Sequence, residues 1–93
     1  MEDRETRLKR LRMRSWRRGM KEMDLILGPF SDSELAGLGA ADLDLYEVLL
    51  TENDQDLYPW ITARMGGAHP GPAAISPLLD RVARFAQARL AGK

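Results

Sequence analysis

The chain has 93 residues, carries 14 acidic and 14 basic side chains and contains no cysteine. Its length predicts one domain with one modest hydrophobic core, and its composition excludes a disulfide framework, a Cys-based metal site and an apolar run long enough to cross a bilayer. The charges form three blocks, with a net charge of +5 over residues 1–22, −9 over 23–63 and +4 over 64–93, so the fold can set basic against acidic elements or present both to a partner.

The first predicted element is a basic helix over about residues 2–17. This segment lacks proline and glycine and is rich in Arg, Leu and Glu, which favour helix. Its acids come first and its bases last, as the helix dipole favours. Apolar residues recur at three- and four-residue steps and predict a narrow buried stripe. The rest of its surface is arginine, which is either solvated or faces an acidic or phosphate-bearing partner.

A second, short helix is predicted over residues 20–27. Gly28 and Pro29 end it, since proline disfavours helix in the residue before it. Phe30 then either enters the core or faces a partner. Residues 31–34 offer an N-cap followed by acids, which predicts that another short helical turn begins there.

Three more helices are predicted, over residues 40–52, 55–65 and 76–90. Asn53 ends the first of them, and Asp54 is predicted to cap the next. Residues 66–75 are a Gly- and Pro-rich loop. The buried stripe of the last helix is expected to comprise Leu79, Val82, Ala83, Ala86 and Leu90. Because no segment alternates with period two, we predict an all-α fold, a single compact five-helix bundle over residues 1–93 with no sheet.

The segment from Arg17 to Asp24 joins the first two predicted helices. Two arginines precede Gly19, and Glu22 follows it by three residues. Glycine removes a side chain and lets another backbone approach closely. Spacing alone favours a helix end, with Gly19 as the C-terminal cap, the arginines complementing the dipole and Glu22 in the first turn of the next helix.

Two blocks of sequence carry a family resemblance. Arg18 to Glu22 has the pattern R-G-x-x-E and continues into Met-Asp-Leu-Ile-Leu and Pro-Phe. Downstream come Tyr46, a leucine pair and an Asp-x-Asp-Leu-aromatic-x-Trp run that ends at Trp60. Their order and spacing over about residues 10–61 resemble the SdhE family, the small assembly factors for succinate dehydrogenase (in mitochondria, succinate dehydrogenase assembly factor 2).

The resemblance implies a five-helix fold and a function. The partner would be the flavoprotein subunit of succinate dehydrogenase, with the fumarate reductase flavoprotein as a further client, and the chain would promote covalent attachment of FAD to a histidine of that subunit. No stably bound cofactor is expected, and direct binding of FAD is left open. Carried over position by position, the resemblance implies partner contacts at Arg18, Gly19 and Glu22, with Arg17, Met20 and Asp24 beside them.

The sequence offers no set of residues suited to catalysis. His69, the one histidine, lies between glycines and prolines and is expected to be solvated. Asp54 and Asp56 lack the further ligands that a metal site needs, so we assign their block to capping and packing. No glycine-rich loop follows a strand. We therefore expect no metal site and no enzymatic activity of the chain on its own.

Two other functions remain open. The chain could be a helical interaction module for a different partner, or its arginine-rich first helix could bind nucleic acid, although the acidic block over residues 23–63 would repel a polyanion. We expect a monomer in the free state. The N-terminus lacks the apolar stretch of a secretory signal and has more acids than a mitochondrial targeting peptide, which favours a complete chain from the bacterial cytoplasm.

Overall fold

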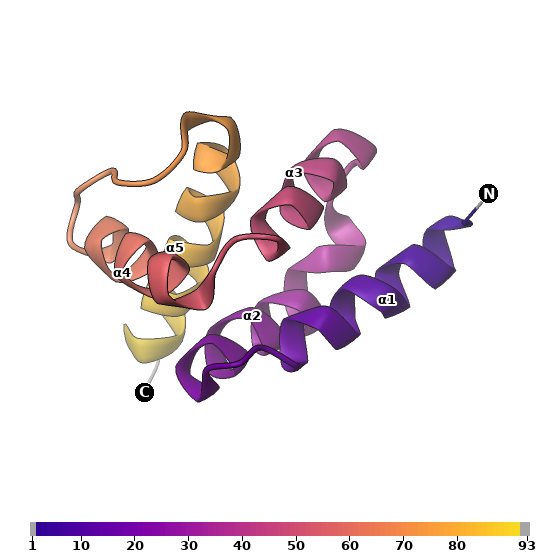
Figure 1. Cartoon of the computed structure of the whole chain (residues 1–93), viewed down its shortest axis with the longest axis horizontal. Helices are drawn as coiled ribbons and strands as arrows, with labels where there is room; N and C mark the ends of the chain where they lie inside the picture. The colour runs from indigo at the N-terminus through magenta and orange to yellow at the C-terminus, as the bar shows by residue number, and fades with distance from the viewer. Residues whose placement is uncertain (1, 92–93) are drawn as a thin grey trace.

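Five α-helices and two short 3₁₀ turns make up the fold (Figure 1). The computed structural model describes residues 2–91. In chain order the elements are α1 (Arg4–Trp16), α2 (Lys21–Glu34), η1 (Leu35–Gly37), α3 (Ala40–Leu50), α4 (Asp54–Met65), η2 (Ala73–Ile75) and α5 (Ser76–Ala91). The prediction of an all-α, five-helix fold is confirmed, and no strand occurs within residues 2–91.

The helices pack as two hairpins with α3 between them (Figure 1). Helices α1 and α2 lie side by side in opposite directions, α4 and α5 form the second hairpin, and α5 also contacts α2 and α3. The Cα radius of gyration is 12.5 Å, close to the value of about 12 Å expected for a folded chain of this length. No helix of the described residues is both long and apolar enough to cross a membrane.

Leucines from all five helices and a small aromatic group build the core. Phe30 lies at its centre, with its ring centroid 5.5 Å from that of Tyr46 in a stacked arrangement and 5.6 Å from that of Phe85 in an edge-on one. The question of whether Phe30 enters the core or faces a partner is thereby settled in favour of the core. The Tyr46 hydroxyl is paired with that of Ser15, 2.5 Å away, so both buried hydroxyls are satisfied.

Helix α2 does not end at Pro29, contrary to the prediction. It continues from Lys21 to Glu34, so the predicted cap at residues 31–34 is also wrong, and Ser31 is buried with its hydroxyl bonded to the Gly28 carbonyl. A proline inside a helix costs about 3 kcal/mol. The continued helix fully buries Phe30 and carries the chain to the buried Leu35, and two such burials contribute about 3–6 kcal/mol. Packing therefore outweighs the local effect of Pro29.

Gly28 is a packing residue rather than a helix end. It is buried in the middle of α2, beneath the indole ring of Trp16 from α1. A Cβ added at position 28 would overlap that ring. The indole nitrogen also donates a hydrogen bond to Asp32, 3.3 Å away. The close approach of α1 and α2 thus depends on the missing side chain of Gly28.

Two further predictions are corrected by the structure. The side chain that caps α4 is Asn53, which accepts a hydrogen bond from the Gln55 amide at 2.8 Å, and not Asp54. Leu90 is not part of the buried stripe of α5, because it is 64% exposed. It lies on the rim of an apolar groove of about 360 Å³ between α2, α4 and α5.

The Gly- and Pro-rich loop between α4 and α5 is anchored by Arg64. Its guanidinium donates to the Pro70 carbonyl, at 2.7 and 3.0 Å, and to the Asp80 carboxylate, at 2.7 Å. His69 lies in this loop and is exposed, as predicted. Arg64 therefore joins the middle of the loop to the start of α5, while the histidine of the loop faces solvent.

Candidate partner-binding site

The loop between α1 and α2 consists of residues 17–20. Arg17 is the C-cap of α1, with φ −121° and ψ 55°, and Met20 is the extended N-cap of α2. The predicted role of Gly19 as the cap is therefore wrong, and Gly19 does not use the left-handed conformation, since Gly67 and Gly71 alone do so among the described residues. Glu22 lies in the first turn of α2, as predicted.

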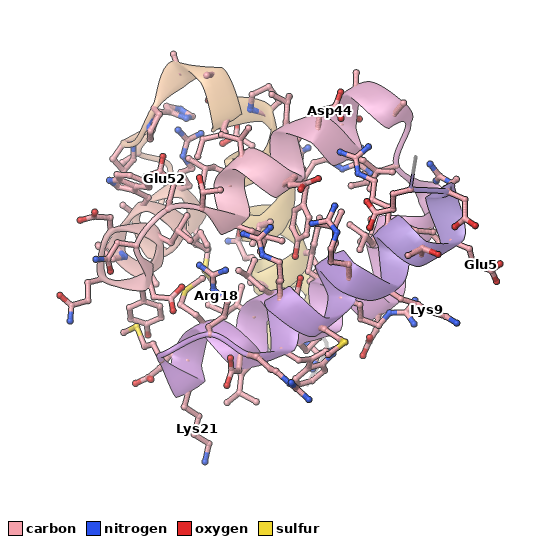
Figure 2. The ribbon with its side chains drawn as sticks, turned by 45° about the vertical axis from the view of Figure 1, so that its right-hand side comes forward. Glu5, Lys9, Arg18, Lys21, Asp44 and Glu52 are labelled. Carbon is pink, nitrogen blue, oxygen red and sulfur yellow. The ribbon has the colours of Figure 1, made fainter. Side chains whose placement is uncertain are left out.

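Arg18 points inward from this loop toward the end of α3 (Figure 2). Its side chain is only 9% exposed, and its Nε donates to Asp54 Oδ1 at 2.7 Å. The other two guanidinium nitrogens donate to the Leu50 and Glu52 carbonyls, at 2.9 and 3.1 Å. The last carbonyls of a helix have no partner within the helix, so Arg18 caps α3 from outside and joins it to the loop.

Asp54 fixes the backbone of the loop as well. Its second carboxylate oxygen accepts a hydrogen bond from the Gly19 amide at 3.0 Å. On the other side, Asp24 Oδ1 accepts one from the Arg18 amide at 2.6 Å. Two carboxylates, one from α4 and one from α2, therefore hold consecutive amides of the loop and restrict its backbone.

The remaining residues of the loop face solvent. Arg17, Gly19 and Glu22 are exposed, and Met20 is half-buried. A Cβ placed on Gly19 would meet no atom within 4 Å, so the space in front of this glycine is open. A shallow hollow of about 280 Å³ lies beside it, lined by Gly19, Met20, Asn53, Asp54 and Gln55.

The six predicted site residues thus lie together but divide into two groups. Arg18 and Asp24 point toward their own chain, whereas Arg17, Gly19, Met20 and Glu22 border open space. Sequence reasoning missed Asp54 as part of this site and assigned it to helix capping. The one signal available was that the two blocks carrying the family resemblance contain charges of opposite sign.

Two arginines of α1 are paired with carboxylates of α3. Arg7 pairs with Asp44 at 2.7 Å, and Arg10 pairs with Glu47 at 2.9 Å. The hydrogen bond from Arg10 is the main reason that the pKa of Glu47 lies below its ordinary value. The basic and acidic blocks of the sequence therefore lie against each other, which leaves fewer cations on α1 for contacts with nucleic acid.

Comparison with known proteins identifies the family. The family described as the flavinator of succinate dehydrogenase matches residues 9–86. The chain belongs to this family. The match includes the loop between α1 and α2 and both carboxylates that hold it, so the geometry described above is that of a flavinator-family member.

Flavinator-family relatives occur in bacteria and in mitochondria. The chain is 38% identical over 79 residues to the FAD assembly factor SdhE of Pseudomonas putida, covering 84% of this chain and 93% of the relative. It is 45% identical over 60 residues to the FAD assembly factor SdhE of Pseudomonas aeruginosa, covering 64% and 70%. It is 39% identical over 80 residues to the mitochondrial succinate dehydrogenase assembly factor 2 of Meyerozyma guilliermondii, covering 86% of this chain and 53% of that protein.

The match to the mitochondrial relatives is partial in length. Besides the 53% of the Meyerozyma protein, the matched segment spans 26% of the Mycosarcoma maydis assembly factor 2. The relatives bear the names of assembly factors rather than of catalysts. Within the described residues, no group of three or more His, Cys, Asp or Glu side chains is placed to hold a metal ion.

Proposed function

We propose that this chain binds the flavoprotein subunit of succinate dehydrogenase and promotes the covalent attachment of FAD to it, with the fumarate reductase flavoprotein as a second client. Membership of the flavinator family over residues 9–86 supports the proposal, as do the names of the two Pseudomonas relatives. The observation that carries it is the loop around Gly19, which is open to solvent yet held rigidly from behind.

The exposed residues of the loop are the proposed contacts. Gly19 allows a client backbone to approach closely, because no atom of the chain occupies the space in front of it. Arg17, Met20 and Glu22 border the same space and would meet polar and apolar groups of the client. Arg18, suggested by the resemblance as a contact, is assigned to positioning the loop together with Asp24, because its guanidinium is already satisfied within the chain.

The proposed mechanism is the stabilisation of one client conformation. The reacting histidine and the flavin both belong to the client complex, so this chain contributes by binding the arrangement in which they meet. Holding two reacting groups in place removes much of the entropic barrier to bond formation. The effect requires that the chain binds this arrangement more tightly than the others. We accordingly propose a chaperone that holds no cofactor of its own, acts in the cytoplasm and is a monomer when free.

Gly19→Arg tests the proposal. The variant should fold normally, because a side chain at position 19 extends into open space, but it should abolish flavinylation of the client by blocking close approach. Gly37→Arg is the matched control, since Gly37 is also exposed and also has no atom within 4 Å of an added Cβ. Circular dichroism checks the fold, and in-gel flavin fluorescence of the co-expressed flavoprotein reports attachment. A flavin band of wild-type brightness with Gly19→Arg would overturn the proposal.

A further inference from the structure

Helices α1 and α3 are joined by a ladder of polar contacts. Arg4 donates to the Ala36 and Leu38 carbonyls, both at 2.9 Å, just before α3 begins. The next contacts are those of Arg7 and Arg10 with α3 carboxylates. Arg18 closes the ladder at the end of α3. The partners advance along both elements together, so α1 and α3 run in the same direction, with one arginine of α1 or of the loop after it at each step.

One arginine of this series makes no such contact within the described residues. Arg14 lies between the Arg10 and Arg18 contacts, at the same three- to four-residue spacing. The spacing of Asp44 and Glu47 on α3 leads next to its C-cap, Thr51. Thr51 is not acidic, and its hydroxyl donates to the Val48 carbonyl at 2.6 Å. Among the described residues, Arg14 pairs with no carboxylate.

Arg14 lines a hollow on the surface. Met13, Arg14, Arg17 and Arg18 line a space of about 290 Å³ at the end of α1. Arg18 is neutralised there by Asp54, but Arg17, like Arg14, pairs with no carboxylate of the described chain. The C-terminal dipole of α1 compensates only about half a unit charge, against two guanidinium charges. The hollow is therefore electropositive.

Two of the arginines that line this hollow also act electrostatically on a buried tyrosine. Burial raises the pKa of Tyr46 to about 12, and the positive charges of Arg18 and Arg14 oppose that rise. The guanidinium of Arg14 thus lies near enough to the Arg18 site to act on the same buried hydroxyl. Arg14 is half-buried, whereas Arg17 and Met13 are exposed, so the hollow is accessible to a charged group from outside the chain.

We infer that the hollow formed by Met13, Arg14, Arg17 and Arg18 receives an acidic side chain of the client flavoprotein, whose carboxylate supplies the missing step of the ladder. This inference rests on the proposed function. The hollow adjoins the loop around Gly19, because Arg17 and Arg18 belong to both, so a protein that lands on Gly19 covers the hollow as well. A planar guanidinium binds a carboxylate through two parallel hydrogen bonds, which would fix the orientation of the client on the loop.

The first test compares Arg14→Gln with Arg84→Gln. Arg14 makes no hydrogen bond or ion pair within the described chain, so its replacement should leave the melting temperature unchanged. Arg84 is an exposed arginine of α5 that is likewise unpaired among the described residues, and its replacement changes the net charge equally. We expect Arg14→Gln to weaken binding to the purified, FAD-free flavoprotein by about tenfold to a hundredfold, as for a lost hydrogen bond to a charged group. Arg84→Gln should bind like the wild type.

Salt dependence and cross-linking provide two further readouts. The affinity of the wild type should fall more steeply with added salt than that of Arg14→Gln, because one ion pair is screened in the first case and absent in the second. In Arg14→Lys, a carbodiimide should link the new amine to a client Asp or Glu, and mass spectrometry of the cross-linked peptides locates the acid.

The outcomes separate the inference from the proposed function. If the wild type binds the flavoprotein and Arg14→Gln binds it within twofold of Arg84→Gln, the inference is overturned while the proposed function stands. The inference is also overturned if inorganic phosphate stabilises the wild type but not Arg14→Gln while their client affinities agree, because the hollow then binds a free anion. If the wild type does not bind the flavoprotein at all, the proposed function itself fails.

Discussion

Removing the Asp54 carboxylate should destabilise the protein far more than removing any exposed acid. In Asp54→Ala, Arg18 would keep its two carbonyl partners but lose its counter-charge, and the Gly19 amide would lose its acceptor. Both side chains of the ion pair are largely shielded, with exposures of 9% and 13%. Breaking a buried pair by deleting one partner costs about 3–5 kcal/mol.

The size of this effect is measurable against the total stability. A domain of this length has a free energy of unfolding of about 5–14 kcal/mol, so a loss of about 3 kcal/mol removes a large part of it. One kcal/mol lowers the melting temperature of such a domain by about 4–8 °C. We therefore expect Asp54→Ala to melt about 12 °C or more below the wild type. Circular dichroism at 222 nm measures the melting temperature, and urea unfolding checks the loss of free energy.

Asp56→Ala is the matched control. Asp56 lies in the same first turn of α4, but it is exposed. Both substitutions remove one negative charge near the start of α4, where an acid contributes about 0.3–1 kcal/mol through the helix dipole. The difference between the two variants therefore isolates the contacts of Asp54 with Arg18 and with the Gly19 amide. If both melt within about 3 °C of each other, the reasoning about the buried pair is refuted. A double-mutant cycle with Arg18→Met should further give a coupling energy of about 1–3 kcal/mol.

Two other predictions concern the contacts of α1. Gly28→Ala should displace the indole of Trp16, which an added Cβ would overlap, and should lower the free energy of unfolding by about 1–3 kcal/mol; an unchanged near-UV circular dichroism spectrum would contradict this. The second is Glu47→Gln. Chiefly through its hydrogen bond with Arg10, the pKa of Glu47 lies below its ordinary 4.5, so its contribution to stability is present above pH 4.5 and is lost as the pH falls through the folded-state value. On acidification, the melting temperature of the variant should fall less than that of the wild type. If the two melting temperatures fall in parallel at acid pH, the contribution assigned to the Glu47 carboxylate is refuted.

Helical periodicity was sufficient to predict the five helices, because each carries apolar residues at helical spacing over two turns or more. It failed at Pro29. The local rule places a helix end before a proline, whereas the position of α2 is decided by what Phe30 contacts, namely Tyr46 and Phe85. Those contacts come from α3 and α5, so no window of sequence around Pro29 contains them.

The partner-binding role of the loop between α1 and α2 stays a prediction, and the construction of this loop could not be predicted from the sequence. The pattern R-G-x-x-E drew attention to this loop, yet it did not show that Arg18 points inward, since that depends on Asp54, 36 residues along the chain. A first-turn aspartate is most simply interpreted as a cap. In the structure Asn53 caps α4, and Asp54 instead binds the loop between α1 and α2.

The pairing of Arg18 with Asp54 also has a consequence for biosynthesis. The hairpin of α1 and α2 leaves the ribosome first, but the Gly19 amide and the Nε of Arg18 find their acceptor, Asp54, only when the start of α4 has followed. A truncated or nascent chain that lacks α4 therefore cannot form the contacts with Asp54 that hold the loop between α1 and α2. Under the proposed function, a chain would therefore offer its client the complete docking surface only once α3 and α4 are in place.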